Sequence, residues 1–204
     1  AYYHKPWPRH HPWIRFDYDE KAKLQRQAVE IENLSFTYEG GERKIFNNLT
    51  ITINAGEKIA VIGENGVGKT TFLKLLMGEL QPQFGTIKWA EKANPGYYAQ
   101  DHSAQFAGTE SLTEWIAGYA RATIEDGGDL ETLIRGTLGR LLFSGDEVKK
   151  PVNVISGGEQ GRMLFGKLML SKHNVLLMDE PTNHLDMESI EALNSGLEKF
   201  PGTL

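Results

Sequence analysis

The stretch GENGVGKTT, residues 63–71, constrains the fold more than any other part of the sequence. It fits the pattern G-x-x-x-x-G-K-[ST], which forms a phosphate-binding loop when it lies between a strand and a helix. The apolar residues within 57–63 predict a short strand before it, and the apolar spacing within 69–80 predicts a helix after it. Glycines let such a loop turn back, so that its N–H groups converge on phosphate oxygens. The sequence therefore predicts a nucleoside triphosphate site at the start of a helix.

The side chains of this loop suit the charges of such a ligand. Lys69 would reach the β- and γ-phosphates, and the Thr70 hydroxyl would hold Mg²⁺. The N-terminal end of the helix adds its positive dipole. The alternative is a glycine-rich turn that binds nothing, and the strand and helix patterns on either side argue against it. The predicted nucleotide-binding residues of the loop are Gly63, Glu64, Asn65, Gly66, Val67, Gly68, Lys69, Thr70 and Thr71.

A second stretch, NVLLMDEPTNHLD at residues 174–186, joins an apolar strand to a group of polar side chains. It is typical of a strand that ends in a Mg²⁺-binding aspartate, Asp179, followed by Glu180, which would polarise the attacking water. A positioned general base contributes about 10²- to 10⁴-fold to a rate. A protein-only metal site would need Glu180 and His184 on one helical face, and Pro181 argues against a continuous helix there. A capping or turn carboxylate is the simpler alternative for Asp179.

Composition limits the kind of protein that carries these motifs. The 204 residues are enough for one α/β domain with a small inserted subdomain. Lys plus Arg number 22 against 27 Asp plus Glu, and this net charge of −5 argues against binding nucleic acid through bulk positive charge. The absence of cysteine excludes disulfides and thiolate metal sites. No apolar run approaches the length of a membrane span, and the N-terminus lacks a signal-peptide core. We therefore expect a soluble, cytoplasmic protein.

The first residues differ in composition from the rest of the chain, being rich in proline, histidine and tryptophan. This pattern predicts an extended segment rather than a folded core. Its histidines, His4, His10 and His11, could suggest metal ligands, but no further ligands cluster near them. We favour a solvated segment whose Trp7 and Trp13 dock on another surface.

Further along, strand-like stretches come first and helical stretches then alternate with strands. Residues 28–38 and 45–53 are strand-like, as are the shorter stretches 85–90, 95–100 and 174–178. Helical patterns occupy most of the chain between and after the last two of these strands. This order predicts an α/β core into which a mainly helical stretch is inserted.

Taken together with SGGEQ at residues 156–160, the two motifs resemble an ATP-binding-cassette (ABC) domain, because all three follow the order of that family. The resemblance implies a P-loop NTPase core with an N-terminal antiparallel β-subdomain and an inserted helical subdomain at about residues 101–157. It also implies a nucleotide-binding domain over residues 28–204, preceded by an extended linker tail over residues 1–27. ATP and Mg²⁺ are the implied cofactors.

The resemblance also assigns roles to residues outside the two motifs. Tyr38 matches the aromatic residue that stacks on adenine in this family, although a lone tyrosine on a strand is more often a packing residue. Gln100 matches the glutamine that reaches Mg²⁺ and the attacking water, although a lone glutamine is more often a surface residue. The implied catalytic residues are Glu180, Gln100 and Lys69, and the implied Mg²⁺ ligands are Thr70, Gln100 and Asp179.

The SGGE stretch has both a structural and a functional interpretation. Ser156 and Glu159 satisfy the capping-box pattern at the start of a helix. A helix start with two glycines also exposes N–H groups to an anion. The resemblance implies that this signature, Ser156, Gly157, Gly158 and Glu159, contacts the ATP of a second cassette, and that Asp186 lies in a turn at the same interface.

Glu159 and the turn NHLD are similar to the ABC-F branch, whose members are cytoplasmic tandem cassettes that act on ribosomes, and most of all to its bacterial YbiT subgroup. The resemblance implies a second cassette with the end of the interdomain linker, which hydrolyses ATP as two cassettes close head to tail. Ribosome and tRNA would be partners, and a membrane would not. The resemblance implies that the switch histidine of the family follows Leu204; His184 belongs to the turn and is not that residue. Because this chain stops before the switch histidine, we expect weak or no ATPase activity from it alone. The alternatives are the ATP-binding subunit of a transporter and a nucleotide-sensing interaction module.

Overall fold

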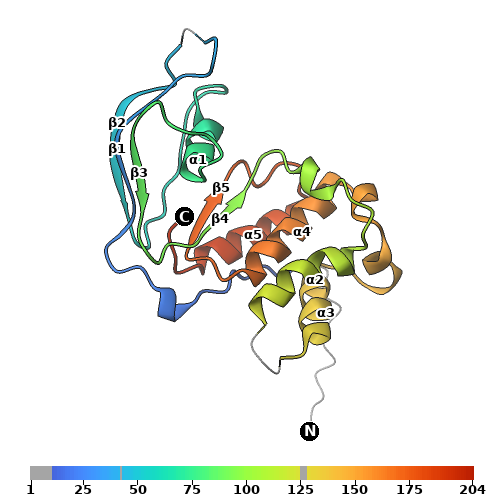
Figure 1. Ribbon diagram of the computed structural model, residues 1–204. Helices are drawn as coiled ribbons and strands as arrows, with labels where there is room; N and C mark the ends of the chain where they lie inside the picture. Colours follow the sequence, from blue (N-terminus) through green and yellow to red (C-terminus); the bar gives the residue numbers. More distant parts are fainter. Residues whose placement is uncertain (1–10, 42, 125–127) are drawn as a thin grey trace. The chain divides into compact units, whose positions relative to one another are not determined.

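The computed structural model describes residues 11–41, 43–124 and 128–204, and these form two compact units (Figure 1). The helical unit comprises the described residues within Ala1–Asp17, Asp101–Lys172 and Thr182–Phe200. The sheet unit comprises Tyr18–Gln100, His173–Pro181 and Pro201–Leu204. Predictions that concern His4, Trp7 and His10 lie outside the described residues.

An antiparallel sheet forms the first part of the sheet unit. Its central strand β1 (Gln27–Phe36) lies between β2 (Phe46–Asn54) and β3 (Phe84–Trp89). The buried residues of β1, among them Ile31 and Leu34, face the core, and β2 is largely exposed. The antiparallel β-subdomain expected from the resemblance is therefore present, and the three strand predictions are confirmed.

Two parallel strands form the second sheet of this unit. β4 (Pro95–Tyr98) pairs in register with β5 (Val175–Met178), so that Tyr98 lies opposite Met178. Strands buried on both faces are continuous apolar runs, which explains the sequence VLLM. The helix α1 (Lys69–Leu76) packs its apolar side chains into the same core as β1 and β5. The P-loop helix and the strand that precedes Asp179 thus share one core, and the predicted α/β fold is confirmed.

The strand predicted for residues 57–63 is wrong, because the structure forms no strand there. The Ile59 N–H donates to the Leu204 carbonyl at 2.8 Å, and the Leu204 N–H donates to the Glu57 carbonyl at 2.9 Å. These bonds pair the first half of the segment with the last residue of the sequence, whereas Ile62 is 90% exposed. A strand needs a neighbour along its whole length, and an apolar run cannot show whether that neighbour exists.

Four α-helices build the helical unit, and each begins at a serine or aspartate N-cap. They are α2 (Leu112–Thr123), α3 (Leu130–Arg140), α4 (Gly157–Leu170) and α5 (Met187–Glu198). Short 3₁₀ helices complete the described chain: η1 (Glu20–Ala22), η2 (Ser103–Phe106), η3 (Gly145–Lys149) and η4 (Val152–Val154). α2 packs against both α3 and α4, and Ile116 of α2 and Phe165 of α4 are fully buried. The described helices are all too short or too polar to cross a lipid bilayer.

Candidate functional site

The loop before α1 turns sharply in a conformation that suits glycine. Gly66 has φ 77° and Gly68 has φ 117°, in the left-handed region that glycine adopts without steric cost. Gly68 is the N-cap of α1, and no side chain of the described residues caps this helix start. The first N–H groups of α1 therefore lack the partner that a capping side chain would supply, which leaves them available to an anion.

Close contacts explain why two of these loop positions must be glycine. A Cβ atom on Gly68 would lie 2.5 Å from Cγ2 of Ile45, and one on Gly63 would lie 2.8 Å from Cγ1 of Val67. By contrast, a Cβ on Gly66 would meet no atom within 4 Å. The three glycines thus have different reasons to be there, and Gly68 combines a crowded position with a left-handed backbone.

Lys69 lies over the loop that precedes it. Its Nζ donates to the carbonyl oxygens of Gly63 at 2.8 Å and Glu64 at 3.0 Å. These two carbonyls are the hydrogen-bond acceptors of the ammonium group within the described chain, and they hold it above the loop. An anionic ligand in the loop would compete for the same charge.

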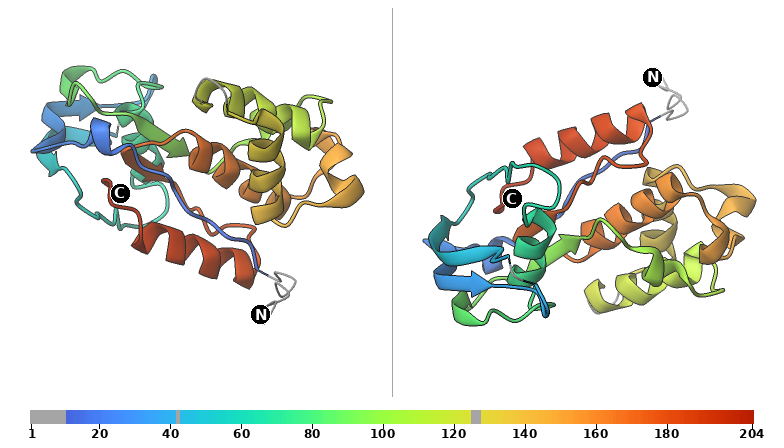
Figure 2. Two further views of the ribbon diagram at one scale, coloured as in Figure 1. Left: turned by 90° about the horizontal axis from the view of Figure 1, so that it is seen from below. Right: turned by 90° about the horizontal axis from the view of Figure 1, so that it is seen from above.

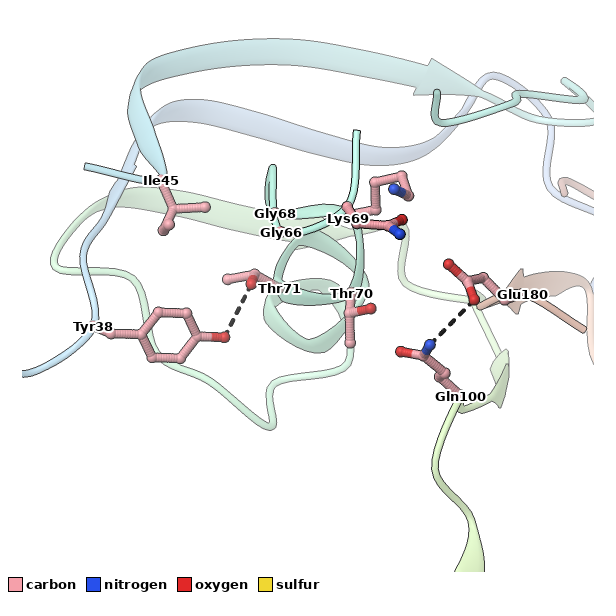
Figure 3. Close-up of a pocket in the computed structure, with 10 residues that line it drawn as sticks. Tyr38, Ile45, Gly66, Gly68, Lys69, Thr70, Thr71, Gln100 and Glu180 are labelled. Atoms are coloured by element: carbon pink, nitrogen blue, oxygen red, sulfur yellow. Dashed lines mark hydrogen bonds between the residues drawn. The ribbon is translucent and has the colours of Figure 1, made fainter. Parts of the chain in front are cut away.

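A pocket of about 280 Å³ opens beside this loop (Figure 3). Its lining residues are Tyr38, Ile45, Asn65, Gly66, Gly68, Lys69, Thr70, Thr71, Gln100 and Glu180. All but one of these were predicted from the sequence, although they come from four separate parts of the chain. Ile45 was missed, because an isolated isoleucine at the start of a strand carries no signal for a pocket.

Tyr38 lies at the outer side of the pocket and is fixed by two contacts. Its hydroxyl is hydrogen-bonded to the Thr71 hydroxyl at 2.9 Å, as Figure 3 shows. Its ring meets the Phe36 ring edge-on, with centroids 5.0 Å apart. The side chain is nevertheless 47% exposed, so a flat ligand has access to it.

Gln100 and Glu180 face each other at the ends of the two parallel strands. Nε2 of Gln100 donates to Oε2 of Glu180 at 3.1 Å (Figure 3). Both residues follow their strands by two positions, and β4 and β5 are in register, which brings the two side chains together. Glu180 has φ 48°, a conformation that costs energy for a residue other than glycine and is often found at functional sites.

Asp179, directly before Glu180, is buried at 3% exposure. Its Oδ2 has no hydrogen-bond partner among the described residues. A buried carboxylate oxygen without a partner is costly, and a bound cation would remove that cost. The neighbouring Tyr97 was not predicted from the sequence to lie near this site. Burial, and after it the charge of Asp179, raises the pKa of the Tyr97 phenol. Oxygen atoms of Thr70, Gln100 and Asp179 form the donor set that Mg²⁺ prefers, so these residues fit the ion.

The SGGE stretch lies in the helical unit, at the start of α4. The Ser156 side chain accepts from the Glu159 N–H at 3.3 Å, and the Ser156 N–H donates to Oε2 of Glu159 at 2.7 Å. The capping box predicted from the sequence is thus confirmed. Burial alone would raise the pKa of Glu159, but these hydrogen bonds and the charges of Lys150 and Arg162 hold it below its usual value.

The turn after β5 packs against the same helix start. A Cβ on Gly158 would lie 2.9 Å from the His184 carbonyl oxygen, and one on Gly157 would lie 3.4 Å from Cβ of His184. His184 itself has φ 65°. The two glycines therefore permit a close approach within the helical unit, which the sequence did not indicate.

Asp186, predicted to lie in a turn, is the N-cap of α5. Its Oδ1 accepts from the Ser189 N–H at 2.7 Å, and its Oδ2 lies 3.2 Å from Nη1 of Arg162 on α4. The hydrogen bonds from Ser189, followed by the charge of Arg162, lower the pKa of Asp186. This turn residue is thus engaged within its own chain.

The chain forms a turn and not a helix over residues 180–184, so Glu180 and His184 do not share a helical face. Among residues 11–41, 43–124 and 128–204, no group of three or more His, Asp or Glu side chains could hold a metal ion. His11 lies within the described residues and is exposed.

Comparisons with known proteins agree with this geometry. Residues 46–183 match the model of the family described as ABC transporter. The chain is 54% identical over 196 residues to "Probable ATP-binding protein YbiT" of Escherichia coli O157:H7, covering 96% of this chain and 35% of that protein. It is 34% identical to "ABC transporter F family member 5" of Arabidopsis thaliana, over 98% of this chain and 28% of that protein. The chain thus spans about a third of the length of these curated relatives.

A solved structure gives the same fold at lower identity. A bacterial Atm1-family ABC exporter with ATP bound superposes with a TM-score of 0.70 over 95% of this chain and 35% of that chain, at 19% identity. The chain therefore belongs to the ATP-binding-cassette (ABC transporter) family and is an ATP-binding cassette of the ABC-F branch.

Proposed function

We propose that this cassette hydrolyses ATP, and that it does so when it closes head to tail on a second cassette. The observation that carries the proposal is the Gln100–Glu180 pair, which lies in the same pocket as the phosphate loop and directly after the buried Asp179. A carboxylate held by a neighbouring amide beside a phosphate-binding loop is suited to orient a water molecule.

Each part of the pocket then has a task. Lys69 leaves the loop carbonyls to bind the β- and γ-phosphates, and the exposed ring of Tyr38 stacks on adenine. Thr70, Gln100 and Asp179 would hold Mg²⁺, which neutralises phosphate charge when it is bound. Glu180 accepts a proton from the attacking water.

The SGGE signature and the turn that contains Asp186 would act at the interface with the partner cassette. Ser156, Gly157, Gly158 and Glu159 would contact the nucleotide of the partner cassette, with Asp186 at the same interface. Because one chain carries both sets of motifs, two copies in head-to-tail arrangement would complete two sites. The activity of this chain alone should therefore be weak and should rise with protein concentration.

Replacement of Glu180 by Gln tests the catalytic role. In the whole protein, which supplies both cassettes, we expect the variant to bind a fluorescent ATP analogue as the parent does, while phosphate release falls by about 10²-fold or more, the range of a positioned base. Glu91→Gln, in an exposed turn of the sheet unit, is the matched control and should leave both measurements unchanged. Unchanged turnover in Glu180→Gln would remove Glu180 from its proposed role.

For the whole protein we propose a cytoplasmic factor that acts on the ribosome in translation, with this chain as one of its two cassettes. The support is the similarity to ABC-F relatives and the share of their length that the chain covers. Cosedimentation of the whole protein with ribosomes in a non-hydrolysable ATP analogue tests this. Copurification with a transmembrane subunit instead would favour the alternative, an ATP-binding subunit of a transporter.

A further inference from the structure

Residues 12–17 run as an extended segment along α5 (Figure 2). Side chains of such a segment alternate between its two faces. The alternation here is complete within the helical unit: Pro12, Ile14 and Phe16 are buried, and Trp13, Arg15 and Asp17 are exposed. A segment with this pattern packs on a surface along its whole length.

One side of that surface is a stripe formed by α5 and by Phe200, two residues after the end of the helix. Ser189, Leu193, Gly196 and Phe200 are all buried, and their spacing of four, three and four residues places them on one helical face. Ile14 lies against Gly196, and the rings of Phe16 and Phe200 meet edge-on with centroids 6.2 Å apart. The extended segment thus contacts the C-terminal part of this stripe, at Gly196 and Phe200.

Gly196 shows how close this contact is. A Cβ on Gly196 would lie 2.9 Å from the carbonyl oxygen of Ile14 and 3.0 Å from its Cγ2. Glycine weakens the middle of a helix relative to alanine, so its presence at this position needs a reason. The approach of the Ile14 backbone supplies one.

The other side of the surface is the last residue of α3. The Trp13 N–H donates to the Arg140 carbonyl at 2.7 Å, and the Arg140 guanidinium lies over the Trp13 ring, 4.8 Å from its centroid. The hydrogen bond satisfies one of the carbonyls that a helix leaves free at its end. The segment therefore contacts α3 and α5 within six residues.

This matters because α5 has few other neighbours among the helices. α2 packs against α3 and α4, whereas none of the described helices makes comparable contacts with α5. Besides the segment, the ion pair of Arg162 with Asp186 fixes the start of α5. The segment fixes its second half.

We propose that residues 12–17 are a strap that fastens α5 to the end of α3 and so passes any displacement of the chain before Pro12 to these two helices. The strap is part of the helical unit, which also contains the SGGE helix start. This role does not depend on ATP hydrolysis.

Single-residue amide exchange tests the strap, because the Trp13 N–H reports directly on docking. In the 204-residue chain we expect Gly196→Ala to speed exchange of this amide by about tenfold or more, together with amides in the second half of α5 and at the end of α3. Gly118→Ala is the matched control, since Gly118 lies within α2 and a Cβ there would meet nothing within 4 Å. It should leave the Trp13 amide as protected as in the parent chain.

Phe16→Ala gives the same test without any change to a helix, and it decides the matter if Gly196→Ala does not fold. Faster exchange at Trp13 together with α3 and α5 supports the proposal. A Trp13 amide that exchanges in the parent as fast as an unfolded chain overturns it. A second result also overturns it: faster exchange of the Trp13 amide in Phe16→Ala, with unchanged exchange of the amides in α3 and α5. The strap would then be released without any effect on the two helices.

Discussion

The starts of α1 and α4 are both rich in glycine, yet they are built in opposite ways. At α1 the N-cap is Gly68, with a left-handed backbone and no capping side chain from the described residues. At α4 the N-cap is Ser156, with an extended backbone and a complete capping box with Glu159. The first helix start leaves its N–H groups open, and the second satisfies part of them within the chain.

This difference shows that glycine content alone does not define an anion site. An uncapped helix start next to a pocket has a positive end that a ligand can neutralise. In a capped helix start such as that of α4, side chains of the chain itself, including the carboxylate of Glu159, already accept from some of the N–H groups. An anion from another chain would meet only the N–H groups that remain. The glycines of α4 also allow the His184 turn to approach closely.

The largest effect should come from Gly68→Ala at the open helix start. The new Cβ would meet Ile45 at 2.5 Å, and a left-handed residue other than glycine costs about 1–3 kcal/mol. We expect a loss of unfolding free energy in urea of at least that size, and a loss of affinity for a fluorescent ATP analogue. Gly66→Ala, also at a positive φ (77° against 117° for Gly68) but in open space, is the control and should cost less. Equal losses in the two variants would mean that contact with Ile45 is unimportant.

A smaller effect is expected from Ser156→Ala at the capped start. Loss of an N-cap side chain costs about 1 kcal/mol, and Ser156→Thr should restore most of it. Urea unfolding measures both variants. At low protein concentration, binding of the ATP analogue should be unchanged in Ser156→Ala, because the pocket belongs to the sheet unit. Reduced binding by the monomer would contradict the separation of the two helix starts.

The smallest effect should be a pH dependence of the unfolding free energy. It comes from the Glu159 carboxylate in the capping box of α4, and the start of α1 has no such capping carboxylate. The folded pKa of Glu159 lies below its usual value of 4.5, so the unfolded chain binds the proton more readily. The stability that Glu159 contributes is therefore complete above about pH 4.5 and is lost as the pH falls through the folded pKa. Unfolding free energies of the parent and Glu159→Gln, compared from neutral to acid pH, should show a shallower acid loss in the variant. Parallel curves would exclude this contribution.

Local patterns predicted most of the elements, because their signals lie within a few residues. The capping residues Ser156 and Asp186 and the apolar spacing of α1 and α4 each specify a helix start or a helical face on their own. The segment at residues 57–63 has an equally clear apolar pattern and still forms no strand. A strand depends on a neighbour that the pattern does not contain.

The residues of the candidate site fall into the same two groups, those that a local pattern predicts and those that depend on a contact between distant segments. Gly63–Thr71 and the Asp179–Glu180 pair were predicted because the chemistry of phosphate and Mg²⁺ needs these residue types at fixed spacing. Ile45, Tyr97 and the contact of Gly158 with His184 were missed. Each depends on two parts of the chain that meet only in three dimensions.

By itself, the sequence determined the family, the phosphate loop and the strand that ends in Asp179, since these are short patterns whose physical roles are local. Only the tertiary structure decided that Gln100 meets Glu180 and that Oδ2 of Asp179 is buried without a partner. It also decided that Gly196 in α5 makes room for the backbone of Ile14. Packing between distant segments sets these contacts, and a residue's place in the sequence does not reveal which distant segment it will touch.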